Sequence, residues 1–147
     1  MKKSNRIIPL KQLASRHEQQ AARTLGESKK TLSDHQQRLD DLNAYRREYQ
    51  NRFQTEGLMG MNGSKLQAYQ NFIAQLDQAI EQQKIQLVEA QQSCINETRQ
   101  WQERHIKTEV FTKTVERFEN QEKIMREKKS QREIDDYVNA RLHTTIK

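Results

Sequence analysis

The sequence predicts an all-α fold, in which two long helices form an antiparallel coiled-coil hairpin and the second helix is the longer one. Of its 147 residues, 33% are apolar and 31% charged, which is too little apolar material for a globular core. Pro9 is the only proline, so every later residue keeps the backbone N–H that a helix needs. Apolar residues also recur every seven positions on both sides of a glycine cluster, as expected for two paired helices.

The glycine cluster marks the turn of the hairpin. Gly57, Gly60 and Gly63 fall within seven residues, the clearest break in the chain. We therefore expect a first helix over residues 10–55 approximately, a glycine loop at 56–63 and a second helix from 64 to about 142. Together they would make a single coiled-coil domain over residues 1–147. Ser64, followed three positions later by Gln67, predicts a capping box at the start of the second helix.

The second helix carries the longer heptad pattern. Its a positions are Leu66, Ile73, Ile80, Leu87, Cys94, Trp101, Thr108 and Val115. Its d positions are Tyr69, Leu76, Gln83, Ala90, Glu97, Arg104, Phe111, Phe118 and Met125. A repeat sustained over more than four heptads predicts a coiled coil.

The first helix repeats the pattern, with an a set and a d set of its own: Leu25, Leu32, Leu39, Arg46 and Phe53, then Ser28, His35, Leu42 and Tyr49. A turn near residue 61 pairs residues whose numbers sum to 122, so Phe53 should face Tyr69. Under this rule Leu10 lies beside residue 112, and the last 30 or so residues of the second helix have no partner in the chain. They still carry apolar side chains such as Phe118.

Composition and motifs argue against catalysis. The sequence contains no phosphate-binding glycine loop, no Cys or His pair at metal-ligand spacing and no nucleophile beside a base, so we expect no enzyme activity, metal or cofactor. No segment approaches the roughly 20 apolar residues of a membrane span, and we expect a cytosolic protein that does not insert into membranes. Residues 1–30 hold eight Lys or Arg against two Glu, a basic arm that suits an acidic partner. Aromatic residues do not interleave with these cations, which disfavours nucleic-acid binding.

One surface feature stands out near the turn. Two sets of residues share the spacing 4, 3, 4, and we call them the paired stripes: Arg38, Leu42, Tyr45 and Tyr49 on the first helix, and Phe72, Leu76, Ala79 and Gln83 on the second. Their numbers pair to 121, which places them along one side of the hairpin. Tyr45 and Phe72 occupy g positions, where Glu or Lys is usual, and this favours a docking surface. Leu42, Tyr49 and Leu76 fit equally well as seam residues.

Three groups of residues together are similar to a known family: Ala21-Ala22-Arg23-Thr24-Leu25-Gly26-Glu27, then Leu42 with Tyr45, Glu48 and Tyr49, then Tyr69-Gln70-Asn71-Phe72-Ile73 running on through Leu76, Ala79, Ile80, Glu81 and Gln82. In residue type and spacing they resemble the FliJ family, a small component of the bacterial flagellar protein-export apparatus. The resemblance is clearest from about Leu13 to Gln92. It implies a coiled coil similar to the central shaft subunit of rotary ATPases.

The resemblance also implies partners and a site. Expected partners are the hexameric export ATPase, which the protein would help to assemble and activate, the export gate protein FlhA and flagellar export chaperones. The protein would be cytoplasmic and peripherally associated with the inner membrane at the flagellar base. The gate contact would lie on six residues, Leu42, Tyr45, Tyr49, Phe72, Leu76 and Ala79. Arg38 and Gln83 depart from the family pattern, which has Gln and His there. The alternatives are the stalk of a virulence-type secretion system or a basic nucleic-acid-binding coiled coil.

Overall fold

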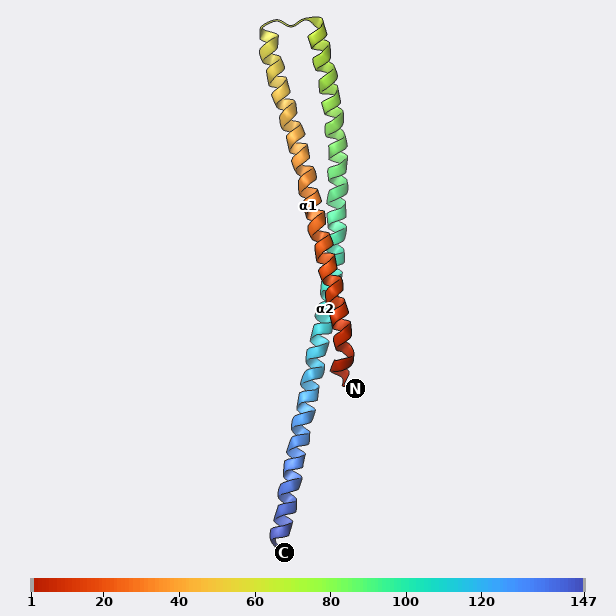
Figure 1. Cartoon of the computed structure of the whole chain (residues 1–147), viewed down its shortest axis with the longest axis vertical. Coiled ribbons are helices and arrows are strands. Elements are labelled where there is room, and N and C mark those ends of the chain that lie inside the picture. The colour runs from red at the N-terminus through yellow and green to blue at the C-terminus, as the bar shows by residue number, and fades with distance from the viewer. Residues whose placement is uncertain (1, 147) are drawn as a thin grey trace. The chain divides into compact units, whose positions relative to one another are not determined.

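The computed structural model describes residues 2–146 and folds them into two helices joined by a short loop (Figure 1). Helix α1 spans Lys3–Leu58 and helix α2 spans Gly63–Ile146, 56 and 84 residues respectively. No strand occurs among the described residues. The predicted all-α hairpin with a longer second helix is confirmed.

The chain divides into two compact units, each of which contains part of both helices. The hairpin unit is Ala21–Trp101, and the terminal unit combines Met1–Gln20 with Gln102–Lys147. The prediction of a single coiled-coil domain over the whole chain stays a prediction.

The hairpin unit is held by a seam at the predicted heptad positions. On α2 the buried residues follow one another at spacings of 4 and 3, as a and d positions do: Leu76, Ile80, Gln83, Leu87 and Ala90. On α1 the half-buried positions include every predicted a and d residue from Leu25 to Phe53. The predicted layer of Phe53 and Tyr69 is present, with the two rings stacked and their centroids 3.6 Å apart.

The seam ends at this aromatic layer, so the heptad position nearest the loop on α2, Leu66, lies outside it although the sequence predicts it inside. Leu66, predicted at an a position, is 42% exposed. The pairing rule sets Leu66 opposite Glu56, a charged side chain that offers no apolar surface to cover it.

The loop corrects the predicted start of α2. The N–H of Lys65 donates to the side-chain oxygen of Asn62 at 2.8 Å, so Asn62 is the N-cap. The capping box predicted for Ser64 is wrong, because the helix begins at Gly63 and the amide of Lys65 then needs an acceptor at residue 62. Gly60 has a φ of 88°, the left-handed conformation that glycine adopts without a steric penalty.

The terminal unit corrects the predicted helix ends. Helix α1 begins at Lys3 rather than near residue 10, and Pro9 lies inside it. Ser4 is buried, and both its backbone N–H and its hydroxyl donate to the carboxylate of Glu122, at 3.2 Å and 2.7 Å. These contacts, with the Lys3 ammonium 5.7 Å from the Phe118 ring centroid, hold the first turns in place despite the missing proline donor. Helix α2 continues to Ile146, four residues past its predicted end.

The seam of the terminal unit is narrow and partly polar. Ala14 and Val115 are its buried apolar residues. Arg104, predicted at a seam position, is exposed, and its neighbour His105 is half-buried instead. The reason is an interaction across the helices, since Nδ1 of His105 lies 2.6 Å from the carboxylate of Glu18.

Past Glu122, α2 has no cover within the terminal unit. Every described side chain from residue 123 to residue 145 is exposed. They include six large apolar ones: Ile124, Met125, Ile134, Tyr137, Val138 and Leu142. Neither helix, over the residues described, is long and apolar enough to cross a membrane.

Candidate partner-binding surface

Five aromatic side chains gather near the loop end of the hairpin unit. Tyr45, Tyr49 and Phe53 come from successive turns of α1, and Tyr69 and Phe72 come from the first turns of α2. Besides the Phe53–Tyr69 stack, Tyr49 stacks on Tyr69 with centroids 5.4 Å apart. Such ring pairs add to the stability given by burial alone.

The structure brings the paired stripes together. The Tyr45 ring meets the Phe72 ring edge-on at 6.0 Å, and the Tyr49 and Phe72 centroids are 4.4 Å apart. Tyr45 is 46% exposed, and Ala79 and Arg38 are exposed as well. These exposed residues lie where the sequence predicts a docking surface, and the docking role itself stays a prediction.

The other stripe residues take part in the seam to different degrees. Leu76 is buried, at 8% exposure, so it packs in the seam. Leu42, Tyr49 and Phe72 are half-buried, which gives each of them one side in the seam and one side towards solvent.

Gln83 also belongs to the seam. It is 8% exposed, and its amide nitrogen lies 3.0 Å from the backbone oxygen of His35 and 3.0 Å from the ring Nδ1 of the same residue. These bonds satisfy a polar group that burial would otherwise destabilise. A partner that docks on the outer surface therefore meets little of Gln83.

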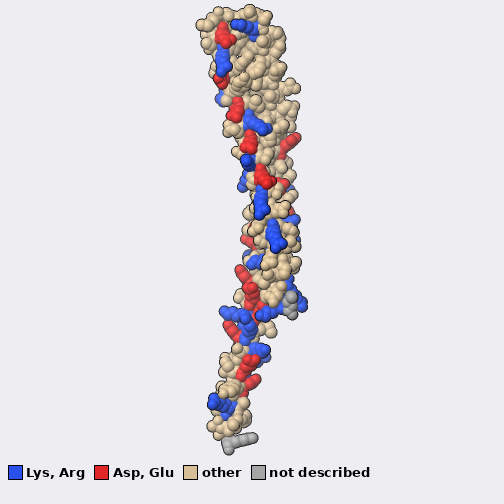
Figure 2. All heavy atoms as spheres, in the orientation of Figure 1, with Lys and Arg blue, Asp and Glu red and all other residues tan. Residues whose placement is uncertain are grey.

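Charge is unevenly distributed around the aromatic cluster. Between Lys65 and Asp77 the sequence of α2 holds no charged residue, and Figure 2 shows a broad uncharged surface over this part of the helix, with charged side chains gathered along α1. At the end of that stretch Asp77 pairs with Arg46 of α1, Oδ1 to Nε at 2.6 Å, and this bond raises the pKa of Arg46 above its ordinary value. The cluster thus adjoins an uncharged surface with an ion pair at its edge.

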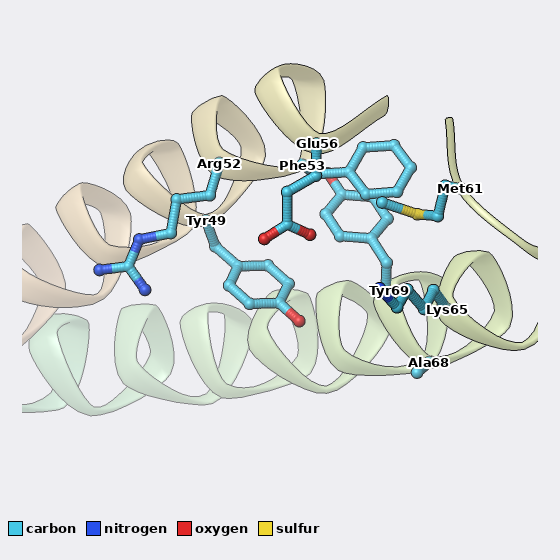
Figure 3. A pocket seen from close by; sticks show the side chains of 8 residues that line it. All are labelled: Tyr49, Arg52, Phe53, Glu56, Met61, Lys65, Ala68 and Tyr69. Carbon is cyan, nitrogen blue, oxygen red and sulfur yellow. The ribbon is translucent and has the colours of Figure 1, made fainter. Parts of the chain in front are cut away.

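A cavity of about 250 Å³ opens beside the cluster, and we call it the loop-end cavity (Figure 3). It is lined by Tyr49, Arg52, Phe53, Glu56, Met61, Lys65, Ala68 and Tyr69. The heptad pattern predicts Phe53 and Tyr69 as a packing layer only and does not predict the cavity. The available signal was the end of the apolar heptad pattern beside a glycine loop, which leaves aromatic rings without a further layer above them.

The described residues contain no group of three or more His, Cys, Asp or Glu side chains placed to hold a metal ion. The side chains that gather near the loop are aromatic rings, aliphatic groups and the ion pair of Arg46 with Asp77.

Comparison with known proteins agrees with the resemblance seen in the sequence. The model of a protein family described as "Flagellar FliJ protein" matches residues 2–145. The chain belongs to the FliJ family. It is similar to the flagellar FliJ protein of Salmonella typhi, with 26% identity over 129 residues that cover 88% of each chain. It is also 26% identical to the Escherichia coli K12 FliJ protein over 132 residues, which cover 90% of each chain. No solved structure matches.

Membership of the FliJ family makes the chain a component of flagellar protein export, and the FliJ family is non-catalytic. The family match also extends the resemblance. Sequence segments between Leu13 and Gln92 carried it, whereas the match to FliJ runs through the terminal unit to residue 145.

Proposed function

We propose that this member of the FliJ family is a shaft of the flagellar export apparatus, which binds the hexameric export ATPase, promotes its assembly and activity, and links it to the export gate protein FlhA. The protein also engages flagellar export chaperones, and catalyses no reaction itself. It acts in the cytoplasm, peripherally associated with the inner membrane at the flagellar base.

The observation that carries this proposal is the surface of the paired stripes. Tyr45 lies 46% exposed at a position where coiled coils normally carry charge, and its ring contacts Phe72 of the opposite helix. Exposed aromatic side chains of this kind are typical anchors of protein interfaces. The six residues of the proposed gate contact are Leu42, Tyr45, Tyr49, Phe72, Leu76 and Ala79.

The exposure of each residue supports a division of roles within this proposed contact. Tyr45, Ala79 and the outer sides of Leu42, Tyr49 and Phe72 are available to the gate, while Leu76 acts through packing. Arg38 is exposed beside them and is a secondary contact.

The proposed ATPase contact lies in the terminal unit. It combines residues 2–20 of the basic N-terminal arm with the uncovered part of α2, where Ile134, Tyr137 and Val138 are exposed. An isolated helix becomes more stable when a partner covers its exposed apolar side chains. A hexameric ring that encloses this segment would supply such cover.

Gate binding is tested with the substitution Tyr45→Ala, assayed against the soluble domain of FlhA. We expect at least a tenfold weaker affinity, since truncation of an aromatic anchor costs about 2 kcal/mol or more. Melting should change little because Tyr45 is nearly half exposed. The matched control is Ile85→Ala, an exposed apolar residue of α2 outside the stripes. Equal binding by the Tyr45 variant and the unmodified chain contradicts the gate contact.

The shaft role is tested by adding the purified chain to its cognate export ATPase. We expect stimulated hydrolysis and ring assembly at substoichiometric amounts. If neither occurs, the shaft proposal is wrong.

A further inference from the structure

The loop-end cavity has the size of a site for one side chain. Its volume of about 250 Å³ is below the roughly 300–1,000 Å³ of sites that hold small-molecule ligands and cofactors. The cavity is built by both helices and the loop, because α1 supplies Tyr49 and Phe53, the loop supplies Met61, and α2 supplies Ala68 and Tyr69.

The walls of the cavity are aromatic. The Tyr69 ring stacks with Phe53 at 3.6 Å and with Tyr49 at 5.4 Å, so three rings form one continuous surface. In Figure 3 the Met61 side chain lies beside this ring pair on the loop side. The faces of aromatic rings carry negative potential, and they attract cations that approach within about 6 Å.

A carboxylate completes the cavity. Glu56 extends from α1 into the space between the Tyr49 ring and the Phe53–Tyr69 stack (Figure 3). Within the described part of the chain its carboxylate forms no ion pair or hydrogen bond. An acceptor directed into an aromatic cavity suits a positively charged ligand.

The two basic residues that line the cavity leave this carboxylate open. Arg52 is paired with Glu48, Nη2 to Oε1 at 2.7 Å, and in Figure 3 its guanidinium points away from Glu56. Lys65 is exposed and forms no ion pair with Glu56 in the described structure. Neither cation therefore occupies the place that a partner's cation would take.

The cavity is continuous with the paired stripes, since Tyr49 belongs to both and its ring also contacts Phe72. We infer that the loop-end cavity binds one basic side chain, arginine or lysine, of the partner that docks on the paired stripes. The rings hold the cation and the stem of that side chain, and Glu56 pairs with its charge. Because it names a site for the gate, this inference rests on the proposed function.

Two substitutions test the cavity in binding assays with the soluble domain of FlhA. Ala68→Trp fills the cavity without removing a seam residue, and we expect at least tenfold weaker binding. Its control is Ala74→Trp, at another exposed alanine of α2 that does not line the cavity.

Glu56→Gln keeps the shape of the side chain and removes its charge. We expect binding to weaken about five- to tenfold, and the difference from the unmodified chain to be smaller at high salt. Its control is Glu81→Gln, whose carboxylate pairs with Lys84 outside the cavity.

The outcomes separate the inference from the proposed function. If Tyr45→Ala weakens binding but Ala68→Trp does not, the gate contact stands and the cavity inference is wrong. If Ala68→Trp weakens binding and Glu56→Gln does not, the occupant is an uncharged side chain and the inference is also wrong. If the unmodified chain does not bind the gate domain, the proposed gate contact fails.

A second measurement needs no gate protein. Blocked tripeptides Gly-Arg-Gly, Gly-Leu-Gly and Gly-Glu-Gly are titrated at millimolar concentration into the full chain, and the ring signals of Phe53 and Tyr69 are followed by nuclear magnetic resonance. We expect saturable shifts with the Arg peptide alone, and none in the Glu56→Gln variant. Equal shifts with the Leu or Glu peptide would overturn the inference.

Discussion

Each of the two units of this FliJ-family protein is stabilised internally by its own kind of interaction. In the hairpin unit the buried residues are mostly apolar, from Leu76 to Ala90, and an aromatic stack closes the seam at the loop end. In the terminal unit the buried apolar residues are Ala14 and Val115, and polar contacts across the helices supplement them, from Ser4 to Glu122 and between Glu18 and His105. Burial of apolar surface depends little on pH and salt, whereas exposed ion pairs depend on both. The hairpin unit is thus built as a stable element, and the terminal unit as one that its surroundings can loosen.

The largest effect should come from an apolar residue of the hairpin seam. Leu87 is 8% exposed, and Leu87→Ala removes buried methyl groups from a layer that the neighbouring turns cannot refill. We expect the free energy of unfolding to fall by about 2 to 4 kcal/mol. Urea unfolding followed by circular dichroism measures it. Val88→Ala, at a residue 61% exposed, is the control and should stay within about 0.5 kcal/mol of the unmodified chain. Equal losses in the two variants would mean that the seam lies elsewhere.

The sequence predicted the hairpin unit well because its seam follows a period. Leu87, Leu76 and the Phe53–Tyr69 layer lie where heptad spacing and a turn near residue 61 place them, and such spacing depends only on helix geometry. The same regularity placed Tyr45 and Phe72 next to each other across the helices.

Features that depend on one side chain reaching another were not predictable in this way. The bond from Ser4 to Glu122 joins residues 118 positions apart, and no period signals it. His105 replaces Arg104 in the seam because Glu18 happens to face it. Asn62 caps α2 although Ser64 is an equally suitable residue type, and no period signals that Glu56 lines the cavity. For such features the residue types allow several arrangements, and only the three-dimensional structure selects one.

A smaller effect should follow from truncation of Val115, the larger of the two buried apolar residues of the terminal unit. Val115 is 5% exposed, and Val115→Ala should destabilise its surroundings by about 1 to 2 kcal/mol. We expect faster amide hydrogen exchange in residues 3–20 with little change between residues 76 and 90, because units of this kind open separately. Val110→Ala, at a residue 56% exposed, is the control. If exchange accelerates equally in both units, they unfold as one body, and the terminal unit does not open more readily than the hairpin unit.

The polar anchor of the N-terminus should have a still smaller effect. Ser4→Ala removes the hydroxyl that donates to Glu122, and we expect several-fold faster exchange in the first turns of α1. The hydrogen bond from the Ser4 hydroxyl is also the main cause that lowers the pKa of Glu122 from its ordinary value of 4.5. That pKa should therefore rise towards 4.5 in the variant, as carboxyl titration by nuclear magnetic resonance would show. Ser33→Ala, on the exposed surface of α1, should change neither quantity.

The smallest effect concerns pH and the pair formed by His105 and Glu18. The hydrogen bond with Glu18, together with the nearby Glu109 at 3.2 Å, raises the pKa of His105 above its ordinary value of 6.5. A raised pKa in the folded state means that protonation stabilises the pairing. This stabilisation is complete below pH 6.5 and is lost as the pH rises through the raised pKa of His105 in the folded state.

Two further basic side chains lie beside the pair: Nη1 of Arg104 is 3.4 Å from Nδ1 of His17. We expect exchange near Glu18, corrected for its intrinsic pH dependence, to accelerate modestly above pH 6.5 while exchange around Leu87 does not. His105→Gln should flatten this profile, and His143→Gln, at an exposed histidine near the end of α2, should leave it unchanged. A profile in the His105 variant that matches the unmodified chain would show that His105 does not cause the pH dependence of the terminal unit.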